Sequence, residues 1–156
     1  MHIQVSTGTG EGPTPLAAFD AALASAGVLN YNLIHLSSVI PPLSVIDRAK
    51  STAPPDEYGH RLYVVMATRG AHDLGQQAWA GLGWVQEPAD GRGLFVELLG
   101  ESRDEVREKI EATLKSMMAS RRRDYGPIES EIVGIECKDH PVCALVIAKY
   151  MSEGWS

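Results

Sequence analysis

Hydrophobic residues recur at helical spacing in an early part of the chain. The recurring positions are Leu16, Phe19, Leu23 and Ala26. Because side chains three or four residues apart share one face of a helix, we expect these four to face the core. Thr14 predicts the N-cap of this helix, Pro15 suits its first position, and Gly27 predicts its end.

A second helix is predicted after residue 100. Ser102 is followed three residues later by Glu105, the pattern of a capping box, so a helix should begin here and run to about Arg122. Its buried face should consist of Val106, Ile110, Leu114 and Met117. We interpret this helix as structural.

Alternating or continuous apolar runs predict seven strands. They cover Ile3–Ser6, Tyr31–Ser38, Leu62–Ala67, Gln77–Gln86, Leu94–Leu99, Ile128–Cys137 and Val142–Lys149. Between the first strand and the first helix, Gly8–Gly12 predicts a glycine-rich turn that allows a close backbone approach. Pro41–Arg61 predicts a long ordered loop, and Gly81 with Gly83 predicts a bulge. This order of elements favours a single α+β domain over residues 1–156, built as a sandwich.

The composition narrows the class of partner. The 156 residues carry a net charge of −6 and no basic stripe, which argues against a nucleic-acid partner, and an acidic surface suits a cationic substrate. Residues 1–5 contain no charged leader, and the longest apolar runs are too short to cross a bilayer. We therefore expect a cytoplasmic protein without membrane contacts.

Histidine and cysteine spacing gives no sign of a metal site. The five histidines form no H-E-x-x-H motif, and the two cysteines match no zinc pattern. Cys137 and Cys143 could approach one another in a hairpin, but in a reducing compartment we expect two free thiols.

Two neighbouring serines, Ser37 and Ser38, end an apolar run and are followed by Pro41 and Pro42. The Ser38 hydroxyl is placed to attack the carbonyl carbon of Ser37 and to convert the amide into an ester. Elimination across Cα and Cβ of Ser38 would then cut the chain. Hydrolysis of the resulting dehydroalanine would leave a pyruvoyl group.

Glu97 is a candidate acid within a predicted strand. Phe95 and Leu99 share its face, so we expect a carboxyl group among apolar neighbours, where the charged form is disfavoured. A protonated carboxyl group there could give its proton to a carbanion.

These segments together resemble the pyruvoyl-dependent arginine decarboxylases. The stretch Asn32–Pro42 resembles the family's self-cleavage motif, N-L-x-x-x-S-S-[VI]-x-P. Gly10–Asp20 is similar to its glycine-rich turn and first helix, and Gly93–Glu97 is similar to its acid-bearing strand. The three motifs occur in the family's order and span most of the chain.

The resemblance implies an αββα sandwich of two central, mainly antiparallel sheets with outer helices. It also implies self-cleavage between Ser37 and Ser38 into a β chain (1–37) and an α chain (38–156). The covalent pyruvoyl group on residue 38 would act as the electron sink, with no metal and no pyridoxal phosphate. The implied reaction converts arginine into agmatine and CO2.

The resemblance also implies roles for single residues. Glu97 would reprotonate the substrate's Cα, while Asn32 and the backbone near Ser37 would orient the scissile bond and stabilise its oxyanion. A carboxylate suits a planar guanidinium, and Asp20 would hold that of the substrate. Leu23 and Ser37 would complete the substrate site. Family members form trimers or dimers of trimers with sites between subunits, and we expect the same here.

The chain departs from the family's pattern at two positions. Ala17 and Leu29 stand where asparagine and glycine are common, and Leu29 could narrow the substrate side of the site. Two alternatives therefore stay open. One is a pyruvoyl decarboxylase for another amino acid, and the other is a homologue that never cleaves and serves as an assembly or binding subunit.

Overall fold

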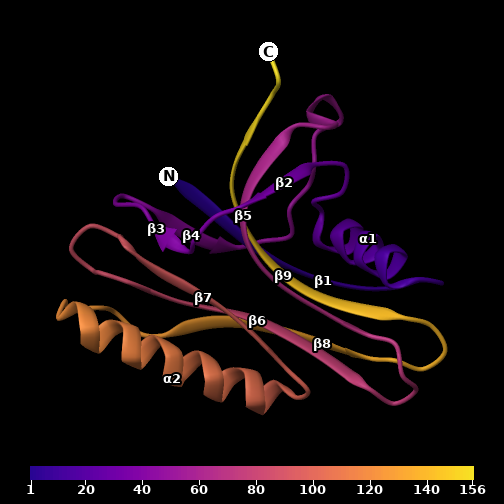
Figure 1. Cartoon of the computed structure of the whole chain (residues 1–156). Helices are drawn as coiled ribbons and strands as arrows, with labels where there is room; N and C mark the ends of the chain where they lie inside the picture. Colours follow the sequence, from indigo (N-terminus) through magenta and orange to yellow (C-terminus); the bar gives the residue numbers. More distant parts are fainter.

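Two β-sheets stack face to face, and one helix covers the outer face of each, in a computed structural model that describes residues 1–156 (Figure 1). The five-stranded sheet contains, in spatial order, β2 (Asn32–His35), β5 (Arg61–Ala71), β9 (Val142–Glu153), β1 (His2–Glu11) and β4 (Val45–Arg48). The four-stranded sheet contains β3 (Val39–Ile40), β7 (Gly93–Gly100), β6 (Gln77–Gln86) and β8 (Glu129–Glu136). Only the β1–β4 and β2–β5 pairs are parallel. The predicted α+β sandwich is confirmed.

The main core lies between the two sheets. Small and branched side chains from both inner faces fill it, and three aromatic residues form its centre. Trp84 packs edge-on against Phe95, with ring centroids 5.8 Å apart, and Phe95 lies 6.2 Å from the ring of Tyr150. Such pairs add packing energy beyond the area they bury. They join β6 and β7 of one sheet to β9 of the other.

Helix α1 (Pro15–Ala26) packs on the five-stranded sheet through alanines. Thr14 Oγ1 accepts a hydrogen bond from the Ala17 amide, and Gly27 ends the helix with φ of +79°, as predicted. The predicted buried face is wrong at Leu16, which is 76% exposed, while Phe19 and Leu23 are only half-buried. The fully buried side chains are Ala18, Ala22 and Ala26.

Gly8 and Gly10, two of the glycines before α1, lie within β1 and do not form a turn. β1 continues to Glu11, and a Cβ placed on Gly10 would lie 2.4 Å from the Ala22 backbone nitrogen. The glycines and the alanine stripe therefore let the helix backbone lie directly on the strand. The expected close approach is confirmed within the fold, although the predicted turn is not.

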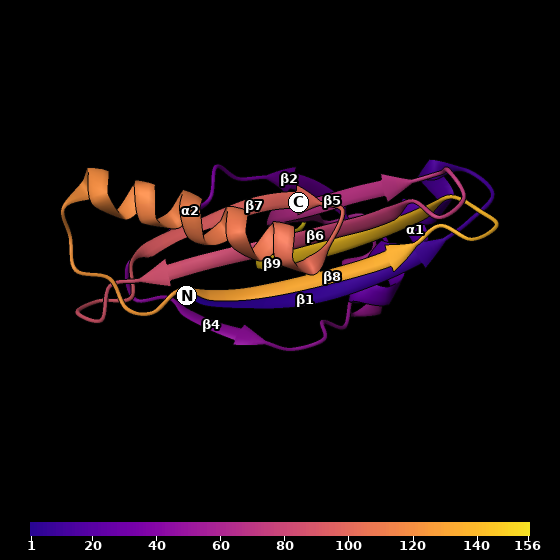
Figure 2. The ribbon, with the colours of Figure 1, turned by 90° about the horizontal axis from the view of Figure 1, so that it is seen from below.

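Helix α2 (Arg103–Arg121) lies across β6, β7 and β8 on the other outer face (Figure 2). Ser102 Oγ accepts from the Glu105 amide, and Val106, Ile110 and Leu114 are buried, as predicted. Gly81 and Gly83 produce no bulge, because β6 stays in register with both neighbours. A Cβ on Gly83 would instead lie 2.2 Å from Ile110 Cγ2, so these glycines make room for α2.

Two predicted segments are divided differently in the structure. The loop Pro41–Arg61 contains β4 and a short 3-10 helix at Pro55–Glu57. The predicted single strand Tyr31–Ser38 is only β2, because the chain leaves the five-stranded sheet after His35 and enters the other at Val39. Ser37 and Ser38 are therefore a link between two sheets and not a strand end.

Both cysteines are free and buried. No helix of the chain is both long enough and apolar enough to span a bilayer.

Candidate active site

The link between the two sheets is anchored at both ends. The Leu36 amide donates to the Val64 carbonyl of β5, with N and O 2.8 Å apart. On the other side, the Phe95 amide of β7 donates to the Ser38 carbonyl, also over 2.8 Å. The bond between Ser37 and Ser38 thus lies where the chain crosses from one sheet to the other.

Ser38 has a backbone conformation that a serine rarely adopts. Its φ is +75°, in the left-handed region that favours glycine. Holding a side chain there costs about 1–3 kcal/mol, and neighbouring contacts must supply that energy. Strain is therefore located at the peptide unit predicted to cleave.

Glu97 is next to Ser38, although 59 residues separate them in the sequence. The Ser38 hydroxyl donates a hydrogen bond to Glu97 Oε1. The expected apolar burial of Glu97 is wrong within one chain, since this side chain is exposed. β3 pairs with β7 only at Gly93 and Leu94, so β7 has no strand neighbour on that side at Glu97, and this free edge lies beside the Ser38 link. That free edge admits the Ser38 hydroxyl.

A pocket of about 400 Å³ opens beside the same bond. It is lined by Met1, Leu36, Ser37, Val39, Pro41, Tyr63, Tyr150, Met151 and Glu153. Ser37, which precedes the bond, is exposed to solvent.

Tyr150 is a residue of this site that the sequence analysis missed. Its hydroxyl donates to the Val39 carbonyl over 2.9 Å, and the residue is 8% exposed. Burial, and to a smaller degree the charge of Glu97, raise the pKa of this phenol above its usual range, so it remains a donor. The available signal was a tyrosine at the end of an apolar strand, since a buried tyrosine hydroxyl usually has a partner.

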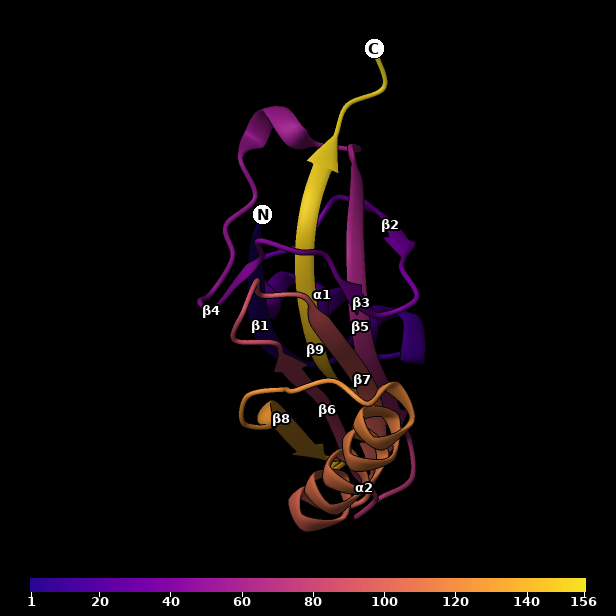
Figure 3. The same ribbon diagram turned by 90° about the vertical axis from the view of Figure 1, so that its left-hand side faces the viewer.

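Asn32 does not reach the scissile bond of its own chain. Its Nδ2 donates to the Gly59 carbonyl over 2.8 Å, and the Trp155 indole donates to the same oxygen. β2 carries the chain about 10 Å from Asn32 to His35 before the link to Ser38 begins. Figure 3 shows the C-terminal residues that carry Trp155 continuing beyond the end of β9.

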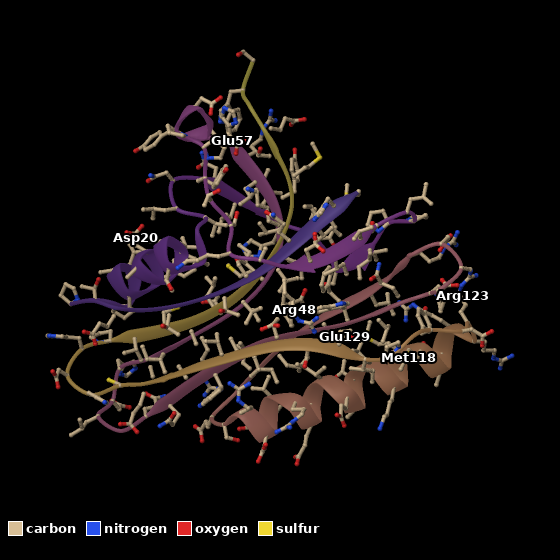
Figure 4. All side chains as sticks on the ribbon, turned by 180° about the vertical axis from the view of Figure 1, so that it is seen from behind. Asp20, Arg48, Glu57, Met118, Arg123 and Glu129 are labelled. Atoms are coloured by element: carbon tan, nitrogen blue, oxygen red, sulfur yellow. The ribbon has the colours of Figure 1, made fainter.

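Asp20, the residue predicted to bind the substrate's guanidinium, is also far from Ser38 of its own chain. Asp20 is exposed on α1, which packs on the outer face of the five-stranded sheet, whereas Glu97 belongs to the other sheet (Figure 4). Leu23 is half-buried and packs against the core under α1. Within one chain, the structure therefore brings together Ser37, Ser38 and Glu97, but not Asn32, Asp20 or Leu23.

No group of three or more histidine, cysteine, aspartate or glutamate side chains is arranged to hold a metal ion. The site itself offers a strained serine peptide, a carboxylate that accepts from the serine hydroxyl, and a phenol that donates to the carbonyl of the next residue.

Comparisons with known proteins agree with this geometry. A family model described as "Pyruvoyl-dependent arginine decarboxylase (PvlArgDC)" matches residues 2–153. The chain is 40% identical over 158 residues to a pyruvoyl-dependent arginine decarboxylase of Halobacterium salinarum, covering 96% of this chain and 93% of that protein. A relative of the same name from Pyrococcus horikoshii is 31% identical over 146 residues, covering 90% of each chain. The chain therefore belongs to the pyruvoyl-dependent arginine decarboxylase family.

Proposed function

We propose that this protein decarboxylates arginine to agmatine and CO2 with a pyruvoyl group that it makes from Ser38. The observation that carries the proposal is the contact between the Ser38 hydroxyl and Glu97 at a strained peptide unit. The residues present fit such a group, because Ser38 lies beside a pocket and next to a carboxylate.

Self-cleavage begins at the Ser38 hydroxyl. Glu97 takes the hydroxyl proton as Oγ attacks the carbonyl carbon of Ser37. The C–N bond breaks, the nitrogen takes a proton, and an ester joins Ser37 to Ser38 Oγ. Loss of Hα then breaks the Cβ–Oγ bond, which leaves a carboxylate on Ser37 and dehydroalanine at position 38. One water enters and one ammonia leaves to give the pyruvoyl end.

The two sheets hold both new chain ends near their original places. β2 is paired with β5 before the break, and β3 is paired with β7 after it. The break also releases the left-handed strain at Ser38, which favours the forward direction.

A pyruvoyl carbonyl on residue 38 would supply an electron sink for the substrate's Cα. Glu97 lies beside position 38 and is therefore the residue placed to hold a proton for Cα.

The substrate site is completed, in this proposal, by a neighbouring subunit. Asp20 is exposed on α1 and lies away from Ser38 of its own chain, so it is available to a second copy, and the half-buried Leu23 follows three residues later on the same helix. Asn32 is also exposed, with its Nδ2 bonded to the Gly59 carbonyl of its own chain.

Three large exposed apolar side chains, Met1, Val39 and Met151, line the pocket beside Ser37. Two more, Leu43 and Val45, follow Val39 in the chain, and both form backbone hydrogen bonds with Met1. Exposed apolar groups that gather in one place are typical of an interaction surface. We propose a homotrimer or a dimer of trimers, acting on a small cationic amino acid in the cytoplasm.

Intact mass spectrometry combined with a product assay tests the function. We expect two fragments, 1–37 and 38–156, with the larger lacking one ammonia relative to an N-terminal serine, and agmatine formed from arginine. Arginine, lysine, ornithine, aspartate and histidine should be compared, and Ser38→Ala should neither cleave nor decarboxylate. Cleavage with another preferred substrate would correct the specificity. A chain that stays intact would instead indicate a non-enzymatic assembly subunit.

A further inference from the structure

We propose that Tyr150 is a positioning residue for self-cleavage, because its hydroxyl holds the Val39 carbonyl and so keeps Ser38 in its left-handed conformation. This inference rests on the proposed function. It assigns to β9 a part in the cleavage step that is separate from the attacking hydroxyl and its carboxylate.

The strand pairing explains why the Val39 carbonyl needs a donor from outside its own sheet. Hydrogen bonds in an antiparallel pair alternate between bonded and non-bonded positions. Ser38 accepts from the Phe95 amide, so the next pair, Val39 opposite Leu94, is a non-bonded one. The Val39 carbonyl therefore points away from β7, at the edge of the four-stranded sheet. Tyr150, from the other sheet, is its donor.

Tyr150 is well fixed for this task. It lies on β9, between β5 and β1, and its ring packs against Phe95. Phe95 is also the residue whose amide holds the Ser38 carbonyl. The phenol and the amide thus fix two consecutive peptide units after Ser38, while the Leu36 amide fixes the chain before it.

These hydrogen bonds restrict the rotation of the backbone at Ser38. After the scissile bond the Ser38 and Val39 carbonyls are held, and before it the Leu36 amide is held. The chain between these points cannot relax by rotating Ser38 out of the left-handed region. Removing the phenol oxygen frees the Val39 peptide, so Ser38 spends less time with its hydroxyl set for attack. We expect cleavage to slow about tenfold, the effect on a barrier of losing one ordinary hydrogen bond.

The first test follows the fraction of intact chain after a short pulse of cell-free synthesis. Tyr150→Phe should cleave about tenfold more slowly than the wild type. Tyr31→Phe is the control, because it also removes one half-buried phenol hydroxyl, which donates to Glu57 and lies outside the pocket. This control should cleave at the wild-type rate. Equal rates for Tyr150→Phe and the wild type would overturn the inference.

A second measurement separates positioning from a general loss of stability. In the uncleaved Ser38→Ala background, labelling valine carbonyls with ¹³C and isoleucine amides with ¹⁵N selects the Val–Ile pairs 39–40, 45–46 and 146–147. Tyr150→Phe should shift the carbonyl resonance of Val39, and Tyr31→Phe should not. An unmoved Val39 resonance would overturn the inference even if cleavage slowed. A wild-type chain that never cleaves would count against the proposed function, while this resonance would still report whether Tyr150 holds the peptide.

Discussion

At Ser38, the backbone is held in a conformation that its own side chain disfavours. The sequence identified the serine pair and Glu97 as candidates, because residue types and flanking prolines carry that information. It could not give the φ of +75° or the contact with Glu97, since both follow from how β3 and β7 pair. The expectation of a buried Glu97 is wrong because a period of two identifies a strand face but not how far the neighbouring strand extends.

Glu97→Gln should preserve the shape of the site but remove the charge that accepts the Ser38 proton. We expect both self-cleavage and decarboxylation to slow by roughly 10²–10⁴-fold, the usual contribution of a positioned acid or base. Intact mass over time measures the first, and CO2 release from fully processed protein measures the second. Glu101→Gln, an exposed carboxylate just after β7, is the control and should change neither. Unchanged rates in Glu97→Gln would exclude this role.

At the scale of the elements, the contact between α1 and β1 depends on glycine and alanine, the two smallest residues. Gly10 and Ala22 allow two backbones to approach so closely that any added carbon meets main-chain atoms. Helical periodicity and the capping residues predicted the position of α1 correctly. The same periodicity wrongly placed Leu16 in the core, whereas this side chain is exposed. The pattern failed because hydrophobicity scales rank leucine above alanine, whereas close packing of a helix on a strand selects the smaller residue.

Gly10→Ala should destabilise the protein by about 1–3 kcal/mol, because the backbone that a Cβ would meet cannot move aside easily. Gly70→Ala is a closely matched control, since both glycines lie opposite Cys143 of β9, one on each side. A Cβ on Gly70 meets only the Val142 oxygen, at an ordinary 3.4 Å. Urea unfolding in the Ser38→Ala background measures both variants. Equal stabilities would contradict the packing argument.

A second link between elements closes one side of the sandwich. Arg48 on β4 forms ion pairs with Glu129 over 2.9 Å and with Glu131 over 2.6 Å, both on β8 (Figure 4). Its guanidinium also lies 4.9 Å from the ring centroid of Trp84. This link joins edge strands of different sheets. The sequence does not predict it, because Pro41–Arg61, which contains β4, has the pattern of a loop.

Arg48→Ala should lower the free energy of unfolding by about 1 kcal/mol, since exposed ion pairs contribute little and the ring contact adds a similar small amount. Arg107→Ala removes a pair with Asp104 inside one helix and should cost less than about 0.5 kcal/mol. Thermal unfolding of both variants gives the comparison. A smaller loss for Arg48→Ala than for Arg107→Ala would show that this link does not hold the sheets together.

For the whole molecule, the proposed cleavage between Ser37 and Ser38 would divide the five-stranded sheet between two fragments. Residues 1–37 contribute β1, α1 and β2, whereas residues 38–156 contribute every other strand. β1 lies between β9 and β4, and both of these neighbours belong to the larger fragment. Separating the fragments would therefore require opening the five-stranded sheet along both sides of β1.

We accordingly expect fragments 1–37 and 38–156 to elute together in native size exclusion and to separate only in denaturant. The buried side chains of Ile3 and Val5, together with the backbone pairing of β1, hold the smaller fragment in place. Native and denaturing mass spectrometry of the same cleaved sample measure this directly. Release of fragment 1–37 without denaturant would show that β1 is held much less firmly than its place in the sheet indicates.

The sequence alone determined the local features: both helices with their caps, most strands, and the serine pair followed by prolines. These are set by neighbouring residues, so periodicity and capping patterns report them. Only the tertiary structure decided that Ser37 and Ser38 cross between two sheets, that Glu97 meets Ser38, and that Tyr150 holds the next peptide. Those facts depend on which strands pair and where each pairing ends, and a one-dimensional pattern contains no direct record of the partner.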